Sequence, residues 1–169
     1  MEPILDATVR EGRVLGALAL PVCVWAAYTD LASMRIRNHA VLALIAAFVL
    51  AGPFVMAPAE YLWRFAQFAL VLVAGFLLNR TIRFGAGDAK FAAAMALYVA
   101  PGDSGAMLAI LSFWSLAGLA LHRLARRSGA IRRATPGWES WEQAAVFPFG
   151  ISLAAALSSY LALAATLGT

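Results

Sequence analysis

Charged residues are scarce in this sequence, and cysteine and histidine are almost absent. Asp, Glu, Lys and Arg make up 13% of the 169 residues, against about 25% in ordinary soluble domains. The hydrophobic share is 63%, and the mean hydropathy is +0.79. A soluble globule of this length could not bury so much apolar surface. We therefore expect an all-α integral membrane protein that forms a single domain over residues 1–169.

The few cysteines and histidines limit the possible chemistry. Cys23 is the only cysteine, so the chain can form neither an intrachain disulfide nor a Cys-type zinc site. His39 and His122 lie at the ends of apolar segments without an evident alignment to Ser and Asp, which argues against a serine mechanism. We expect no metal, no cofactor and no nucleic-acid partner.

Apolar segments alternate with short polar linkers along the whole chain. A helix needs about 20 apolar residues to cross roughly 30 Å of hydrocarbon. Six segments fit about six transmembrane helices, and they cover residues 14–29, 40–59, 61–79, 91–102, 104–121 and 144–169.

Basic residues concentrate in every second linker. Ten of the thirteen lie there: Arg35, Arg37, Arg80, Arg83, Lys90, Arg123, Arg126, Arg127, Arg132 and Arg133. By the positive-inside rule these linkers are cytoplasmic, and both termini of a six-span protein then face outward. The long polar linker, residues 122–143, is either a solvated loop or a segment on the membrane surface, where its Trp residues would reach the headgroups.

The stretch "GAGDAK", residues 85–90, places charge at the edge of the fourth apolar segment. That segment has only twelve uncharged residues, about 18 Å of helix, so the helix must begin near Gly87 or Asp88 to cross. A charge at membrane depth is costly and usually faces a bundle interior or a watery cavity. Alternatively, Asp88 is a helix N-cap. The Gly-Lys-Ser/Thr of a P-loop and the third glycine of a dinucleotide fold are both missing.

Asp30 is the only other acidic residue predicted at the same depth and on the same side as Asp88. It ends the first apolar segment, so the two carboxyl groups can meet from different helices. Two neighbouring carboxylates in a poorly solvated site share a proton. The ionised member can then activate water while the protonated one polarises a carbonyl, as in aspartic proteolysis.

At these residues the sequence resembles the prepilin peptidases, also called type IV leader peptidases, of the GxGD class of intramembrane aspartic proteases. "GAGDAK" matches the motif Gly-x-Gly-Asp-x-Lys with Gly85, Gly87, Asp88 and Lys90. "DLASMRIRN" is similar to the other motif, an aspartate followed by Ile-Pro-Asn, but Arg37 replaces the proline. The remaining matches are Asp30, Ile36 and Asn38.

"FPFG", residues 147–150, resembles a Pro-aromatic-Gly motif of the last span in this family. Pro148 is expected to kink that helix, and Gly150 follows two residues later. Alternatively, the two residues serve only ordinary helix packing. Lys90 lies two residues after Asp88, about 200° around an ideal helix. It should therefore contact substrate or lipid headgroups rather than neutralise Asp88.

The resemblance implies a peptidase in the bacterial inner membrane with its active site on the cytoplasmic side. Asp30 and Asp88 would be its catalytic dyad. Its substrate would be a prepilin or pseudopilin precursor, a basic leader followed by an apolar helix, usually cut after a glycine. The chain lacks the methyltransferase segment and paired cysteines of larger relatives. It therefore resembles the minimal form, such as the peptidases of tight-adherence (Flp) pili.

Three alternatives remain at this level. The two aspartates could form a proton or cation relay in a small transporter, although no repeat in matching halves is visible. They could instead be helix caps in a membrane assembly factor. Presenilin-like and signal-peptide-peptidase-like enzymes also use GxGD, but they are longer and usually place Tyr directly before the first Asp, where this chain has Thr29.

Overall fold

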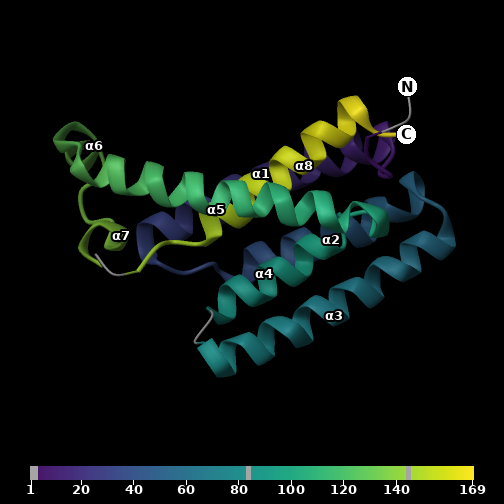
Figure 1. Cartoon of the computed structure of the whole chain (residues 1–169), viewed down its shortest axis with the longest axis horizontal. Helices are drawn as coiled ribbons and strands as arrows, with labels where there is room; N and C mark the ends of the chain where they lie inside the picture. Colours follow the sequence, from purple (N-terminus) through teal and green to yellow (C-terminus); the bar gives the residue numbers. More distant parts are fainter. Residues whose placement is uncertain (1–3, 83–84, 144–145) are drawn as a thin grey trace.

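The computed structural model describes residues 4–82, 85–143 and 146–169, and it is helical throughout apart from turns, connecting segments and one isolated bridge between Leu5 and Gly168 (Figure 1). The described residues contain no strand, which confirms the all-α prediction. The helices in chain order are α1 Val9–Ser33, α2 Asn38–Val55, α3 Pro58–Ile82, α4 Ala86–Ala96, the 3-10 helix η1 Pro101–Asp103, α5 Ser104–Arg127, α6 Gly129–Ala134, α7 Glu139–Glu142 and α8 Gly150–Leu167.

Five of these helices are long and apolar enough to cross a membrane: α1, α2, α3, α5 and α8. They correspond to five of the six predicted segments, so the protein is a multi-pass membrane protein. The last helix begins at Gly150 rather than at Ala144. Ala144 and Arg83 lie outside the described residues.

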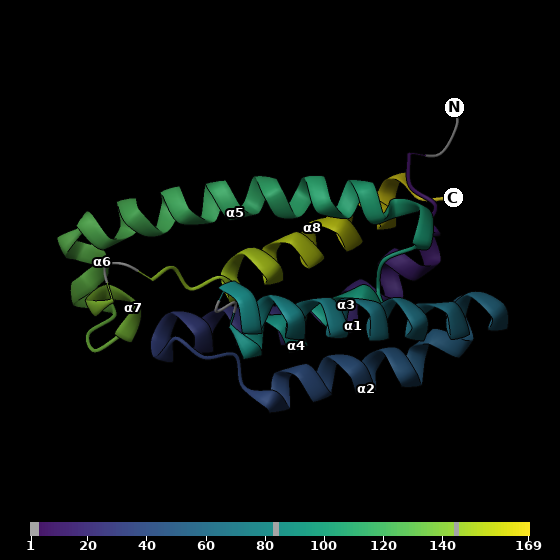
Figure 2. The same cartoon turned by 60° about the horizontal axis from the view of Figure 1, so that its bottom comes forward.

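The fourth predicted span differs from the expected continuous helix. As the short apolar segment required, α4 begins before Phe91, at Ala86, but it ends at Ala96 and is only about 16 Å long. The helix could not have continued through residue 100, since a residue before proline is pushed out of the helical region and Ala100 has φ −59° and ψ 142°. The buried residues 97–100 and η1 complete the passage to the far end of the bundle (Figure 2).

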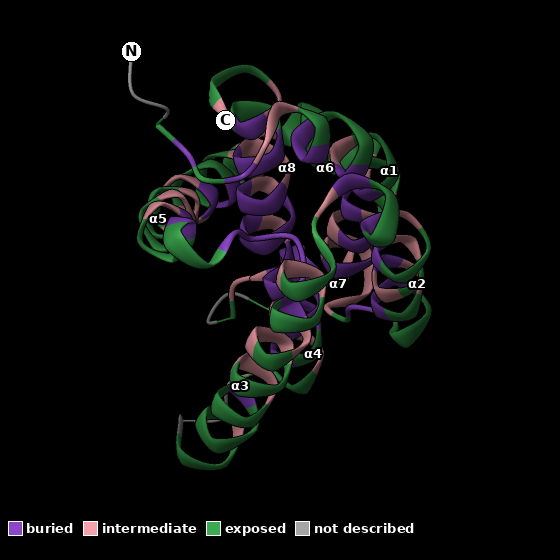
Figure 3. Ribbon diagram, turned by 90° about the vertical axis from the view of Figure 1, so that its right-hand side faces the viewer, coloured by how far each residue is buried: buried purple, intermediate pink, exposed green. Residues whose placement is uncertain are grey.

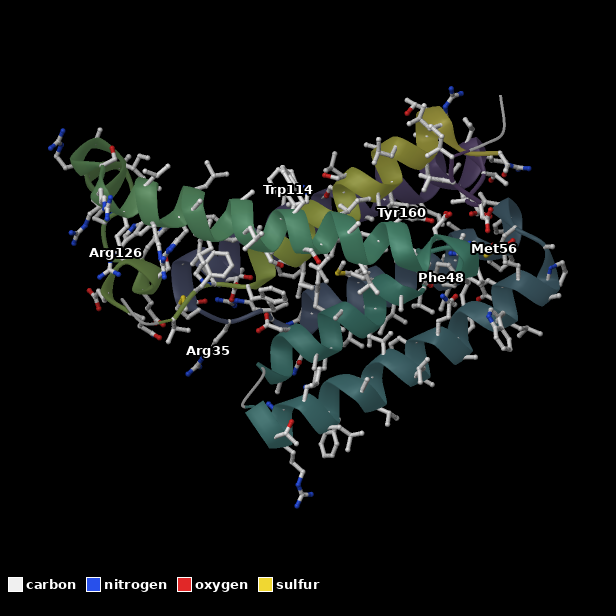
Figure 4. The ribbon with its side chains drawn as sticks, in the orientation of Figure 1. Arg35, Phe48, Met56, Trp114, Arg126 and Tyr160 are labelled. Atoms are coloured by element: carbon white, nitrogen blue, oxygen red, sulfur yellow. The ribbon has the colours of Figure 1, made fainter. Side chains whose placement is uncertain are left out.

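The first and last described residues lie together at one end of the bundle (Figure 1). The Val9 N–H donates to the carbonyl of Thr169 at 3.1 Å, and the Asp103 carboxylate accepts the N–H groups of Asp6 and Ala7 at 2.7 and 3.0 Å. The opposite end holds the α1–α2 connection, α6 and α7, and with them Arg35 and Arg126 (Figure 4). The predicted alternation of linkers between two ends is therefore present in the fold.

Close packing joins α1 to α8 and α3 to α4. A Cβ at Gly12 would overlap the backbone of Ala165, and a Cβ at Gly75 would lie 2.8 Å from that of Ala89. Figure 3 shows that buried residues gather on α1, α4 and α8, whereas α3 lies at the periphery of the bundle. The helix that carries Asp88 therefore sits between the core and an exposed outer helix.

An aromatic stack holds the polar segment 122–143 against the bundle. The His122 ring stacks on Trp141 with centroids 5.1 Å apart, and Trp141 stacks on Trp138 at 5.7 Å. Trp138 in turn meets Tyr28 of α1 edge to face at 5.9 Å. These contacts fold α6 and α7 over the end of the bundle where α1 carries Asp30.

Candidate active site

Asp30 lies in the last turns of α1 and is held by the start of α8. Its side chain is only 4% exposed, and its Oδ2 accepts the Gly150 N–H at 2.8 Å. The first N–H groups of a helix have no intrahelical acceptor, and the positive end of the helix dipole favours a carboxylate. Asp30 therefore joins two helices that are far apart in sequence, and α8 fixes the direction of its carboxyl group.

Gly150 is a glycine for a steric reason. A Cβ there would lie 2.8 Å from Asp30 Oδ2 and 2.9 Å from the Cδ1 of Ile36. Pro148 is buried just before the helix, and its carbonyl accepts the Ile151 N–H at 3.4 Å. The expected kink at Pro148 is therefore wrong, because the proline precedes α8 and so cannot bend it.

Asp88 is the third residue of α4 and not its N-cap. The cap position is Gly85, which makes no side-chain capping bond, so the alternative that Asp88 serves as N-cap is wrong. The Gly85 carbonyl accepts the Ala89 N–H at 2.9 Å, and any Cβ at Gly85 would collide with Asp88 Oδ2. The glycine thus leaves space for a half-buried Asp88 carboxyl that folds back over the helix start.

Ile36 connects the surroundings of the two aspartates. A Cβ on Gly87 would contact the carbonyl oxygen of Ile36 at 3.4 Å, and the other end of Ile36 packs at Gly150 beside Asp30. Ile36 therefore lies between Asp30 and the start of α4, the helix that carries Asp88.

Lys90 and Asn38 lie beside this pair, on the exposed side of α4 and at the first residue of α2. Lys90 Nζ donates to Asn38 Oδ1 at 3.2 Å. Arg37, at the position of the family's proline, has φ −72° and ψ 138°. A proline imposes nearly the same φ, so the chain makes the turn before α2 without it.

A polar pocket of about 520 Å³ opens next to the α1–α2 connection. Glu139 of α7 forms one wall, and the other walls come from residues 33 and 35–39. The role of Glu139 in closing this pocket could not be read from the sequence, because it depends on the stacking of Trp138 and Trp141 that folds α7 back. The one feature of the sequence that could have suggested this folding back of α7 is the presence of two Trp residues in a polar segment.

The arrangement offers two carboxyl groups in a largely apolar setting. Such a pair shares a proton, and it can deprotonate a water with one member while the other donates a hydrogen bond to a carbonyl oxygen. Among the described residues, no group of three or more His, Cys, Asp or Glu side chains is placed to hold a metal ion.

Comparison with known proteins agrees with this geometry. The model of the type IV leader peptidase family matches residues 17–122, which is more than half of the chain and includes both aspartates. Neither the curated proteins nor the solved structures that were compared give a match. The protein has the fold class, the paired aspartates and the sequence pattern expected of a leader peptidase, and it belongs to the type IV leader peptidase family.

Proposed function

We propose that this protein is an aspartic endopeptidase that removes the basic leader from Flp-like prepilins or pseudopilins. The observation that supports the proposal is that Asp30 of α1 and the start of α4, which carries Asp88, lie around the same residue, Ile36, at one end of a membrane-type bundle. Residues 1–169 form one membrane-embedded peptidase domain in this proposal. The family membership supports the peptidase activity, while the substrate and the aspartic mechanism are the proposed parts.

The two aspartates take different roles in the proposed mechanism. Asp30 accepts an N–H from the start of α8, so it is better suited to carry negative charge and to act as the base. Asp88 then holds the shared proton and donates it toward the carbonyl oxygen of the scissile bond. Gly85 and Gly150 leave room for the carboxyl groups, because a Cβ at either position would press on Asp88 or Asp30.

The reaction proceeds by addition and elimination. Asp30 takes a proton from water as the water oxygen bonds to the carbonyl carbon, and Asp88 protonates the carbonyl oxygen. The carbon–nitrogen bond then breaks while Asp30 returns its proton to the leaving amine. Asp88 recovers its proton from the resulting diol, so the products are a leader with a carboxyl end and a pilin with a new N-terminus.

The end of the bundle that holds the two aspartates faces the cytoplasm in this proposal. Nine described basic residues of the ten predicted for that side belong to its linkers and helix ends, and such residues stay on the cytoplasmic side of a bacterial inner membrane. A basic leader remains in the cytoplasm and its apolar helix enters the lipid, so the scissile bond reaches the depth of the two acids. Lys90 and Asn38 lie where the leader approaches.

The test is cleavage of a Flp-type prepilin precursor by the purified protein in detergent. Asp30→Asn and Asp88→Asn keep the side-chain shape but cannot pass a proton, so each should lower the rate by about 10²-fold or more. Glu142→Gln, an exposed acid on α7, is the matched control and should cleave normally. Thermal unfolding checks that all variants remain folded.

Two results would contradict the proposal. Cleavage at the normal rate by both Asn variants would show that the aspartates are structural. A proton flux in liposomes that both variants abolish, from a wild-type protein that cleaves no prepilin, would instead support an ion relay.

A further inference from the structure

An apolar cleft of about 460 Å³ lies between α3, α4 and α5. Figure 1 shows α4 between α3 and α5, and we call the α4 residues that line the cleft its floor. The lining includes Leu70 of α3, Ala92, Met95 and Ala96 of α4, and Leu108 and Leu111 of α5. Because all three helices belong to a membrane protein and the rim residues Leu70 and Leu108 are exposed, the cleft opens to the lipid.

The floor of the cleft continues the helix face that carries Asp88. Ala92 and Met95 follow Asp88 by four and seven residues, so all three share one face of α4. The lining then extends past the helix end to Pro101 and Ser104. The cleft therefore begins one turn beyond Asp88 and runs toward the opposite end of the bundle, over about 12 Å of α3 from Trp63 to Val71.

The shape and chemistry of the cleft suit a helix better than a lipid chain. Ala92 and Ala96 are four residues apart, and small residues at this spacing let the backbones of two membrane helices approach closely. Gln67 Oε1 lies at the wall, buried and without a hydrogen-bond partner among the described residues. An acyl chain has no donor for this oxygen, whereas a peptide helix can offer a side-chain donor.

We propose that this cleft binds the apolar helical segment of the substrate that directly follows the cleaved bond. The inference rests on the proposed function, since it takes the bond between the two aspartates as the start of that segment. When the substrate helix lies along α4, its N-terminal end is near Asp88. The substrate residues that precede this end must be non-helical in order to reach Asp30. The cleft then sets the register of cleavage by holding the apolar segment at a fixed depth.

Photo-crosslinking in the inactive Asp88→Asn variant tests binding apart from cleavage. A p-benzoylphenylalanine replaces Leu108 at the cleft rim or, as the matched control, Phe113 on the same helix. The two side chains are 64% and 63% exposed, but they lie about 140° apart around α5. With the protein in phosphatidylcholine vesicles and a Flp-type prepilin precursor as the probe, position 108 should crosslink to the precursor at several times the yield of position 113.

Filling the cleft gives a second, kinetic test. Ala96→Leu should raise KM for the precursor about tenfold, which corresponds to about 1.4 kcal/mol of binding free energy, while kcat stays near the wild-type value. Ala109→Leu is the control, because Ala109 is an exposed alanine of α5 outside the cleft. An unchanged KM in a folded Ala96→Leu variant would contradict the proposal.

The crosslinking outcomes separate this inference from the proposed function. Equal yields at positions 108 and 113, or crosslinks from position 108 to lipid alone, would overturn the cleft proposal even where the wild-type protein cleaves the precursor. Failure of the wild-type protein to cleave would instead count against the proposed function. If cleavage fails but position 108 still captures the precursor, the cleft remains a binding site for an apolar helix.

Discussion

Replacing Gly150 with alanine tests whether the start of α8 positions the catalytic carboxyl group. The added Cβ would lie 2.8 Å from Asp30 Oδ2 and 3.0 Å from its Cγ. Ordinary van der Waals contact begins near 3.4 Å, so the carboxyl group must move by about 0.6 Å. The Cδ1 of Ile36, 2.9 Å from the same Cβ, blocks one direction of escape.

The magnitude follows from the hydrogen bond that this shift disturbs. A hydrogen bond to a charged group contributes about 1.5–3 kcal/mol, and each 1.36 kcal/mol of transition-state stabilisation changes the rate tenfold. Weakening the bond between the Gly150 N–H and Asp30 should therefore lower the cleavage rate by about ten- to hundredfold. The free energy of unfolding should fall as well, because the same hydrogen bond contributes to stability, so the cleavage rate is compared per folded molecule.

The assay is the initial rate of precursor cleavage, read beside thermal unfolding of the same preparations. Gly105→Ala is the control, since no atom lies within 4 Å of a Cβ at that glycine of α5. A Gly150→Ala variant that cleaves within twofold of the wild-type rate would refute the idea that the close approach of α8 positions Asp30.

Two further predictions concern the opposite end of the bundle. Arg64 is fully buried, and its Nη2 donates to Glu11 at 3.2 Å and to Glu60 at 2.6 Å. Arg64→Met leaves the buried Glu11 without its partner, so the free energy of unfolding should fall by about 3–5 kcal/mol. Denaturation in detergent measures this change. An unchanged free energy of unfolding would show that Glu11 is neutral or solvated there. The buried Tyr160 hydroxyl donates to Asp103 at 2.7 Å and accepts the Ala100 N–H at 3.0 Å. Tyr160→Phe should cost about 1–3 kcal/mol of stability while cleavage by the folded protein stays normal, and a selective loss of activity would contradict this separation of the two ends.

Much of the fold could be predicted because hydrocarbon leaves the chain few choices. A lipid-embedded apolar segment must satisfy its own backbone hydrogen bonds, so each long segment forms a helix. The shortness of the fourth segment also predicted an early start for α4, and the helix begins at Ala86. The end at Ala96 was not predicted, and Pro101 signals only that the helix cannot pass residue 100.

The sequence predicted from depth and sidedness that Asp30 and Asp88 can meet. Both positions lie at helix ends on the same side of the bundle, and a compact bundle brings such ends together. Their surroundings were less predictable. Arg37 adopts the φ of the proline it replaces, and Lys90 bonds Asn38; both depend on the local path between α1 and α2 and on the way α4 packs beside it.

The sequence by itself determined that this is a helical membrane protein and which segments form its long apolar helices. Only the tertiary structure decided that the N-terminus of α8 holds Asp30, because that bond joins residues 120 positions apart. It also decided that Pro148 precedes the last helix and that α3, α4 and α5 leave an apolar cleft beside Asp88. Composition and periodicity report the surroundings of each residue along the chain, whereas these features arise from the way separate helices pack.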